Sequence, residues 1–211
     1  MFRKSLLKAS VAAALLAGAF SANAAVLSAS DNTFGSFDAS SGTRTFNLGS
    51  GLVSDVNISI TFAKCDNPSI GLNGTACIGQ GSSFNREIVF KLTNPFGTTI
   101  NLVNQDTYSG ASPGSGRVTI TFDDEAASVV GGSVVAGGSF RPVGNLSAFD
   151  GTDAAGLWTL LIQDTVGADP LDYFSSTLDV TTGNNVPEPG SLALLGLGMI
   201  GLGLARRRRQ A

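Results

Sequence analysis

The chain has 211 residues, with 13 Lys and Arg, 16 Asp and Glu, and no histidine. Most of the basic residues lie at the two ends, so residues 25–189 keep six of them against all 16 acidic residues, a net charge of −10. Such a body repels phosphate backbones, which argues against nucleic-acid binding. The absence of histidine from the sequence removes Ser-His-Asp and Cys-His catalysis and most zinc chemistry.

The N-terminus predicts a secretory signal peptide over residues 1–24. A basic start precedes an apolar run that is too short to span a membrane stably, and Ala22-Asn23-Ala24 has the small-x-small form of a cleavage site. We therefore expect Ala22, Ala24 and Ala25 to form the cleavage site, with the cut after Ala24. The rest of the chain is then exported across the cytoplasmic membrane; an uncleaved anchor is the alternative.

Residues 25–182 carry the pattern of a single all-β module. Apolar residues alternate with polar ones from Val56 to Phe62, which is typical of a half-buried strand. The same two-residue period recurs in four later segments, and residues 25–51 suggest one or two further strands. Those four segments are 86–93, 116–123, 157–164 and 175–180. Clusters of Gly, Pro, Asn and Asp separate them, which predicts an antiparallel β-sandwich or barrel.

Trp158 and the two cysteines have structural interpretations. Trp158 alternates with Leu160 and Ile162, so we expect it on the core face rather than exposed for stacking on a sugar ring. Cys65 and Cys77 lie in a polar, turn-rich segment of an exported chain, which predicts a local disulfide. Their spacing is not that of a redox motif, so we expect a structural clip.

The segment 140–180 contains a characteristic order of proline, glycine, aromatic and aliphatic residues. They are Pro142, Leu146, Phe149, Gly151, Gly156, Trp158, Leu160, Asp164 and Leu178. In this order the segment resembles the P domain (Homo B domain) that follows the catalytic domain in subtilisin-like proprotein convertases. The resemblance extends over roughly 52–180 and implies a jelly-roll-like β-sandwich. Two departures are the inserted Cys65–Cys77 loop, which replaces a family segment carrying His and Asp, and the last strand, where Tyr173 and Phe174 are the nearest aromatic candidates.

The acidic residues lie mainly in turns, where carboxylates are commonly solvated or bonded to backbone amides. The alternative is calcium, which takes oxygen ligands from flexible acidic loops and which some P domains carry. On this basis Asp124, Asp164 and Asp169 are the candidate ligands, and calcium is the one cofactor that the sequence leaves open. No catalytic residue is assigned, because Lys64 and Lys91 lie in or beside strand patterns that argue against Ser-Lys catalysis.

The C-terminus has three parts: a linker with the motif Pro187-Glu188-Pro189 (183–189), an apolar run (190–205) and a basic end (206–211). The basic end contains Arg206, Arg207, Arg208 and Arg209. This order of parts resembles the PEP-CTERM sorting signal of Gram-negative bacteria that also make exopolysaccharide. The apolar run predicts a single hydrophobic helix of 16 residues, which at about 1.5 Å per residue falls short of the roughly 30 Å bilayer core. The resemblance implies a transient anchor that an exosortase-type membrane enzyme recognises and cuts.

Together these patterns predict an exported, non-catalytic module of the cell surface or extracellular matrix. The expected partners are the exosortase-type enzyme and, on the outside, exopolysaccharide or other surface proteins. Two alternatives remain open. One is an accessory module that serves a secreted serine endopeptidase without catalytic residues of its own. The other is a carboxylate-based polysaccharide hydrolase, which needs two carboxylates across a sugar-sized cleft.

Overall fold

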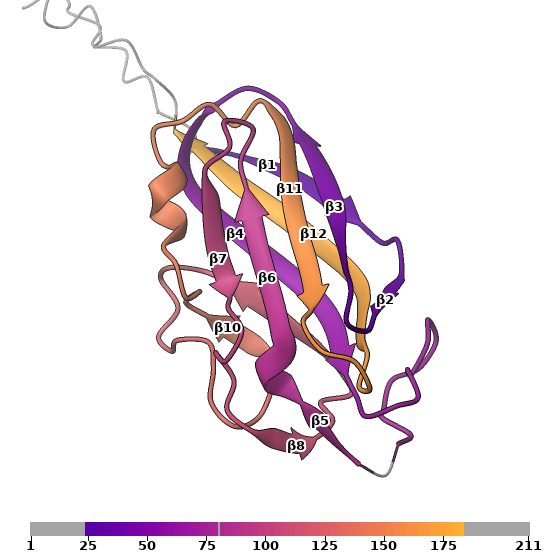
Figure 1. Ribbon diagram of the computed structural model, residues 1–211. Helices are drawn as coiled ribbons and strands as arrows, with labels where there is room; N and C mark the ends of the chain where they lie inside the picture. The colour runs from indigo at the N-terminus through magenta and orange to yellow at the C-terminus, as the bar shows by residue number, and fades with distance from the viewer. Residues whose placement is uncertain (1–23, 80, 184–211) are drawn as a thin grey trace, which may run out of the picture. The chain divides into compact units, whose positions relative to one another are not determined.

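Two facing β-sheets make up the body of the protein (Figure 1). The computed structural model describes residues 24–79 and 81–183. The predicted signal helix before Ala24 and the predicted hydrophobic helix over 190–205 lie outside the described residues. Within the described ranges no helix is long and apolar enough to cross a membrane.

The larger sheet contains the first and last strands of the body. Its order is β1-β12-β4-β9-β10, and the short β2 also pairs with β12. The strands are β1 (Ala25–Asp31), β2 (Gly35–Phe37), β4 (Leu52–Lys64), β9 (Arg117–Phe122), β10 (Gly138–Phe140) and β12 (Leu171–Gly183). The two long strands β4 and β12 pair along almost their whole length and form the centre of this sheet.

The second sheet has the order β3-β11-β6-β7 and is antiparallel throughout. Its strands are β3 (Ser41–Leu48), β6 (Ile88–Thr93), β7 (Thr99–Val103) and β11 (Gly156–Asp164). A separate two-stranded pair and two 3-10 turns complete the described body. They are β5 (Ser82–Phe84), β8 (Ala111–Pro113), η1 (Asn85–Glu87) and η2 (Leu146–Phe149).

The core lies between the sheets and follows the alternation in the sequence. In β4 the side chains of Val56, Ile58, Ile60 and Phe62 are buried against the second sheet. The polar residues between them face outward, where hydroxyl pairs such as Thr61 Oγ1–Thr119 Oγ1 (2.8 Å) join β4 to β9. The prediction of an all-β sandwich is therefore confirmed.

Trp158 lies on the core face of β11, as predicted. Its side chain is fully buried, and its indole N–H donates to the backbone carbonyl of Ala154 at 2.9 Å. The ring packs edge-on against Phe149, with 5.0 Å between the ring centroids. The indole is therefore part of the core and is not available to stack on a sugar.

The structure also corrects two expectations about the strands. All five alternating segments contain a strand, but residues 25–51 form three strands instead of one or two. The antiparallel prediction fails at β10, which runs parallel to β9. The connection between them, residues 123–137, is long and rich in turns, so the chain returns in its original direction. Strands of three residues such as β10 are too short to show an alternating pattern.

The two ends of the described body lie side by side. β1 pairs antiparallel with β12, and Ala25 is opposite Thr182. The hydroxyl of Thr182 donates to the carbonyl of Ala25 at 3.1 Å. β1 thus begins at the first residue after the predicted signal cleavage, and β12 ends at Gly183. At its other end β12 places Leu171 opposite Lys64, far from Ala25 and Gly183.

Candidate functional site

A buried cluster of charged residues lies where β4 and β11 end. Lys64 is the last residue of β4, and Asp164 is the last residue of β11, in the other sheet. Each continues the alternation of its strand, Lys64 after Phe62 and Asp164 after Ile162, so each side chain points into the sandwich. Both side chains have no exposed surface.

Lys64 is held by three carboxylates. Its ammonium nitrogen donates to Asp164 Oδ2 at 2.7 Å and to Glu87 Oε2 at 3.2 Å. It also lies 3.1 Å from Asp169 Oδ2 and donates to the backbone carbonyl of Asp169. Glu87 belongs to η1, and Asp169 belongs to the loop between β11 and β12. The cluster therefore ties both sheets and two connections together.

The charges in this cluster do not balance, since one cation faces three carboxylates. Burial lowers the pKa of Lys64, but its hydrogen bond to Asp164 and the charges of Asp164 and Asp169 outweigh burial and leave the pKa raised. Burial raises the pKa of Asp164 and of Glu87, and Lys64 offsets only part of this rise. The cluster therefore favours a charged lysine. Asp164 and Glu87 keep their protons to a higher pH in the cluster than they would in water.

A substitution at Glu87 tests this direction. A carboxyl whose pKa is higher in the folded state stabilises the fold below its unfolded pKa, and that contribution is lost as the pH rises through the folded pKa. We expect Glu87→Gln to match the wild type when the pH lies below the ordinary value of 4.5. As the pH rises through the folded pKa, the variant should gain stability relative to the wild type. Urea unfolding over a pH series measures this difference, and parallel curves would contradict the raised pKa.

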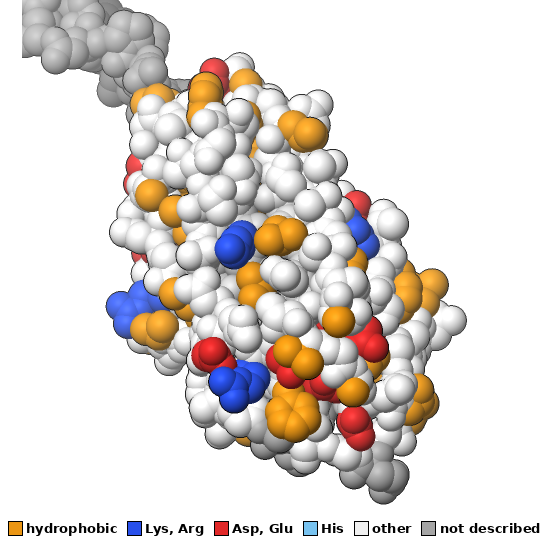
Figure 2. Space-filling model, in the orientation of Figure 1, with side chains coloured by type: hydrophobic (Ala, Val, Ile, Leu, Met, Phe, Trp, Pro, Cys, Tyr) orange, Lys and Arg blue, Asp and Glu red, His pale blue; other side chains and the backbone are white. Residues whose placement is uncertain are grey.

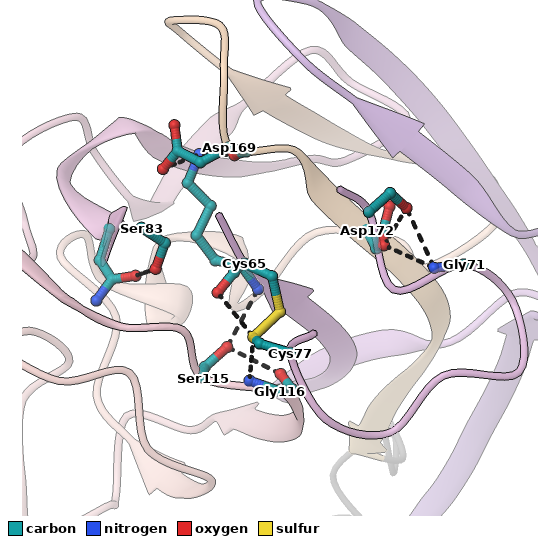
Figure 3. Close-up of a disulfide and its surroundings, with 11 residues drawn as sticks. Cys65, Gly71, Cys77, Ser83, Ser115, Gly116, Asp169 and Asp172 are labelled. Carbon is teal, nitrogen blue, oxygen red and sulfur yellow. Dashed lines mark hydrogen bonds and ion pairs between the residues drawn. A yellow bond between two sulfur atoms is a disulfide. The ribbon is translucent and has the colours of Figure 1, made fainter. Parts of the chain in front are cut away.

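The predicted disulfide joins Cys65 to Cys77 directly beside this cluster (Figure 3). The backbone N–H of Gly116 donates to Cys77 Sγ at 3.3 Å, and the backbone N–H of Lys64 donates to Ser115 Oγ at 3.1 Å. A ring of this size stabilises a fold by on the order of 3 kcal/mol. The disulfide prediction is confirmed, and the clip fixes the loop that follows β4.

The loop closed by the disulfide is also tied to the start of β12. Asp172 Oδ2 accepts hydrogen bonds from the hydroxyl of Ser69 at 2.5 Å and from the backbone N–H of Gly71 at 3.2 Å (Figure 3). Gly71 has a φ of 67°, in the left-handed region that favours glycine. The segment after β4 is thus held at both the disulfide and Asp172.

The three predicted calcium residues do not come together. Asp164 and Asp169 meet around Lys64, whose ammonium takes the place between them that a cation would need. Asp124 instead accepts a hydrogen bond from the backbone N–H of Ser147 at 2.8 Å, at the start of η2. In the part of the chain that the structure describes, no group of three or more His, Cys, Asp or Glu could hold a metal ion. The structure therefore does not bring the three candidate residues together.

Several carboxylates in turns and at strand ends bind backbone amides, as the structural interpretation predicts. The N–H donors lie within one turn or on a neighbouring loop. The carboxylates are Asp31, Asp38, Asp123, Asp153 and Asp172. At Asp153 the bonds from Gly51 and Ala155 lower the carboxyl pKa. These carboxylates therefore stabilise turns.

Two surface hollows in the described body lack the carboxylate pair of a glycosidase. One, of about 480 Å³, lies beside the ends of β1 and β12 and contains Asp153 as its only acid. The other, of about 520 Å³, lies beside the disulfide and is lined by Gly, Ser, Thr, Ala and Cys77. Most of the face in Figure 2 is neither charged nor hydrophobic, and Lys and Arg side chains are few on it.

The C-terminal part of the sequence matches a known family model. Residues 185–209 match the PEP-CTERM protein-sorting motif, which confirms the predicted motif from Pro187 to Pro189 and the arginines at 206–209. The match implies an exported protein that an exosortase processes, and proteins with this motif are sorted to the cell surface in Gram-negative bacteria. No curated protein matches the chain.

Solved structures show only distant likeness to the body. One is the complex of Aeromonas sobria serine protease with the chaperone ORF2, at 15% identity and a TM-score of 0.42, where the match covers 77% of this chain and 27% of that one. Another is PfGH50B, at 12% identity and a TM-score of 0.37, covering 80% of this chain and 24% of the other. The chain thus spans about a quarter of the length of each. These TM-scores are too low to establish a shared fold, so the P-domain type remains a prediction.

Proposed function

We propose that this protein is a non-catalytic β-sandwich module that is displayed at the cell surface or in the extracellular matrix. In this proposal the signal peptide is removed after Ala24, and the C-terminal tail anchors the chain in the membrane for a short time. An exosortase-type enzyme then cuts near Pro187–Pro189 and releases or re-attaches the body. Exopolysaccharide or other surface proteins are the proposed partners outside.

The observation that supports this proposal best is the position of the last strand. β12 ends at Gly183, four residues before Pro187, and every described strand lies upstream of the motif. A cut at the motif therefore removes none of the described strands and breaks none of their pairings. Because Ala25 pairs with Thr182, the two ends of the described body, Ala25 and Gly183, lie on neighbouring strands of one sheet.

That the protein is not a catalyst is part of the proposal. This part rests on the partners that the charged side chains bind. The buried Lys64 is bound to the carboxylates around it, and several turn carboxylates are bound to backbone amides. The hydrolase alternative needs paired carboxylates across a cleft, and neither hollow described above holds such a pair. The accessory role beside a secreted endopeptidase stays open, because it requires only a folded module.

Substitutions in the motif test the sorting step. We expect Pro187→Ala combined with Glu188→Ala and Pro189→Ala to leave the full-length chain in the membrane fraction, because the enzyme loses the segment it recognises. Fractionation and immunoblotting of the native host measure this retention. Asn184→Ala, just upstream of the matched residues, is the control and should be processed like the wild type. Normal processing of the triple variant would contradict the proposed recognition.

A further inference from the structure

The buried cluster holds an amine and a carboxyl group in contact between the two sheets. Lys64 Nζ lies 2.7 Å from Asp164 Oδ2, and neither side chain has exposed surface. The two residues are 100 positions apart in the sequence. The Glu87 carboxyl, 8% exposed, lies 3.2 Å from the same nitrogen. An amine, a carboxyl and a second carboxyl thus meet at one buried point.

This arrangement meets the requirements for amide formation. Condensation of an amine with a carboxylic acid is slow in water, but reacting groups that are held in contact gain a very large effective concentration. Exclusion of bulk water also removes the solvent that would favour separate ions. A neighbouring carboxyl can carry protons between the nitrogen and the departing oxygen.

We propose that Lys64 and Asp164 condense into an intramolecular isopeptide bond, with Glu87 as the proton carrier. Nζ, as the neutral amine, attacks Cγ of the protonated Asp164 carboxyl, and a C–N bond forms. Glu87 takes a proton from the nitrogen and gives one to the departing hydroxyl. The Cγ–O bond breaks and one water molecule leaves. The ion pair and the neutral pair differ only in the position of one proton, so no other reactant is needed.

The charges around the pair favour this assignment of roles. Burial raises the pKa of both Asp164 and Glu87, which favours the protonated acids that the reaction requires. The raised pKa of Lys64 makes the ammonium the resting form, so its proton must pass to a carboxylate before attack. Asp169 fits a holding role, because the backbone N–H of Phe84 binds its Oδ2 and its backbone carbonyl accepts from Nζ. Its Oδ1 is buried without a partner among the described residues.

The bond would join the sheets at one end of the sandwich. β4 belongs to the larger sheet and β11 to the other, so the link would bridge strands that share no backbone hydrogen bonds. It would lie next to the disulfide at Cys65 but, unlike a disulfide, would survive reducing agents. Such a link would help an exported protein withstand proteases and mechanical load.

Mass spectrometry of the protein purified from its native host tests the proposal. After reduction of the disulfide, we expect a mass lower than that of the matching sequence by one water molecule. A tryptic digest should leave Lys64 uncleaved and yield a branched peptide that contains both Lys64 and Asp164. A folded wild-type protein with the full mass and with cleavage after Lys64 would overturn the proposal.

Variants separate this bond from other losses of water, such as ring closure at Asp150-Gly151. Lys64→Arg keeps the cation but lacks the nucleophilic amine, so it should restore the full mass. Asp164→Asn should lose ammonia instead of water, and Glu87→Gln should accumulate the bond at least tenfold more slowly. Loss of water that persists in Lys64→Arg would overturn the assignment. The branched peptide of the wild type decides the question even where a variant does not fold.

Discussion

Replacing Lys64 with methionine is expected to destabilise the body by about 3–5 kcal/mol, as for other buried ion pairs that lose one partner. Methionine fills a similar volume but leaves the carboxylates of Glu87, Asp164 and Asp169 buried without their cation. The free energy of unfolding, measured by urea denaturation near neutral pH, gives the effect. At acidic pH the loss should shrink, because protonated carboxyls no longer need the cation.

The matched control is Lys91→Met, which makes the same substitution in β6. Lys91 is half-buried, and surface substitutions away from such networks usually change stability by about 0.5 kcal/mol or less. Equal effects of the two substitutions would contradict the account of the cluster. A pH-independent loss in Lys64→Met would show that the charge of Lys64 does not set its effect.

Replacing Trp158 with alanine is expected to lower the free energy of unfolding by about 3–5 kcal/mol. The substitution removes the indole that fills the space beside Phe149 and deletes the hydrogen bond to the carbonyl of Ala154. Trp158→Phe should lie between the wild type and the alanine variant, because it keeps most of the ring volume and loses only the donor. Chemical denaturation of the three proteins measures the series.

Leu157→Ala is the matched control for Trp158, since it lies next to it in β11 but is 54% exposed. We expect it to change stability little, because its side chain faces solvent. If Trp158→Ala were as stable as Leu157→Ala, the tryptophan would not be a core residue. The carbohydrate-binding interpretation would then regain support.

The strands and the core were predictable because a two-residue period is a local property of the sequence. It located the buried faces of β4 and β11 and placed Trp158 inside. The same period also extends to Lys64 and Asp164, which occupy the next inward position in each strand. The signal is in the sequence, but a charged residue at the end of an apolar pattern is usually exposed, so the pattern alone does not predict that Lys64 and Asp164 are buried.

The cluster itself was not predictable, because it depends on how the two sheets face each other. Nothing local indicates that the end of β4 meets the end of β11, 100 residues away. The sequence therefore leaves Asp169 open as a calcium ligand, whereas the structure places it against an ammonium group. The parallel pairing of β10 was missed for a related reason, since strand direction is set by the path of a long connection.

The body and the tail carry different information about this protein. The tail matches a sorting motif and implies export and processing. The body provides a sandwich that is complete before the motif begins, with a disulfide and a buried ion cluster at the end opposite Gly183. The two together favour a durable module that is delivered outside the cell.

The central claim is that the chain is cut at both ends and that the intact sandwich remains. Intact-mass and terminal-peptide analysis of the protein from its native host, with and without the sorting enzyme, tests it most directly. We expect the mature chain to begin at Ala25 and to lack residues 190–211 in the normal host, and to keep them when the enzyme is absent. A C-terminus at Ala211 in both hosts would contradict the account.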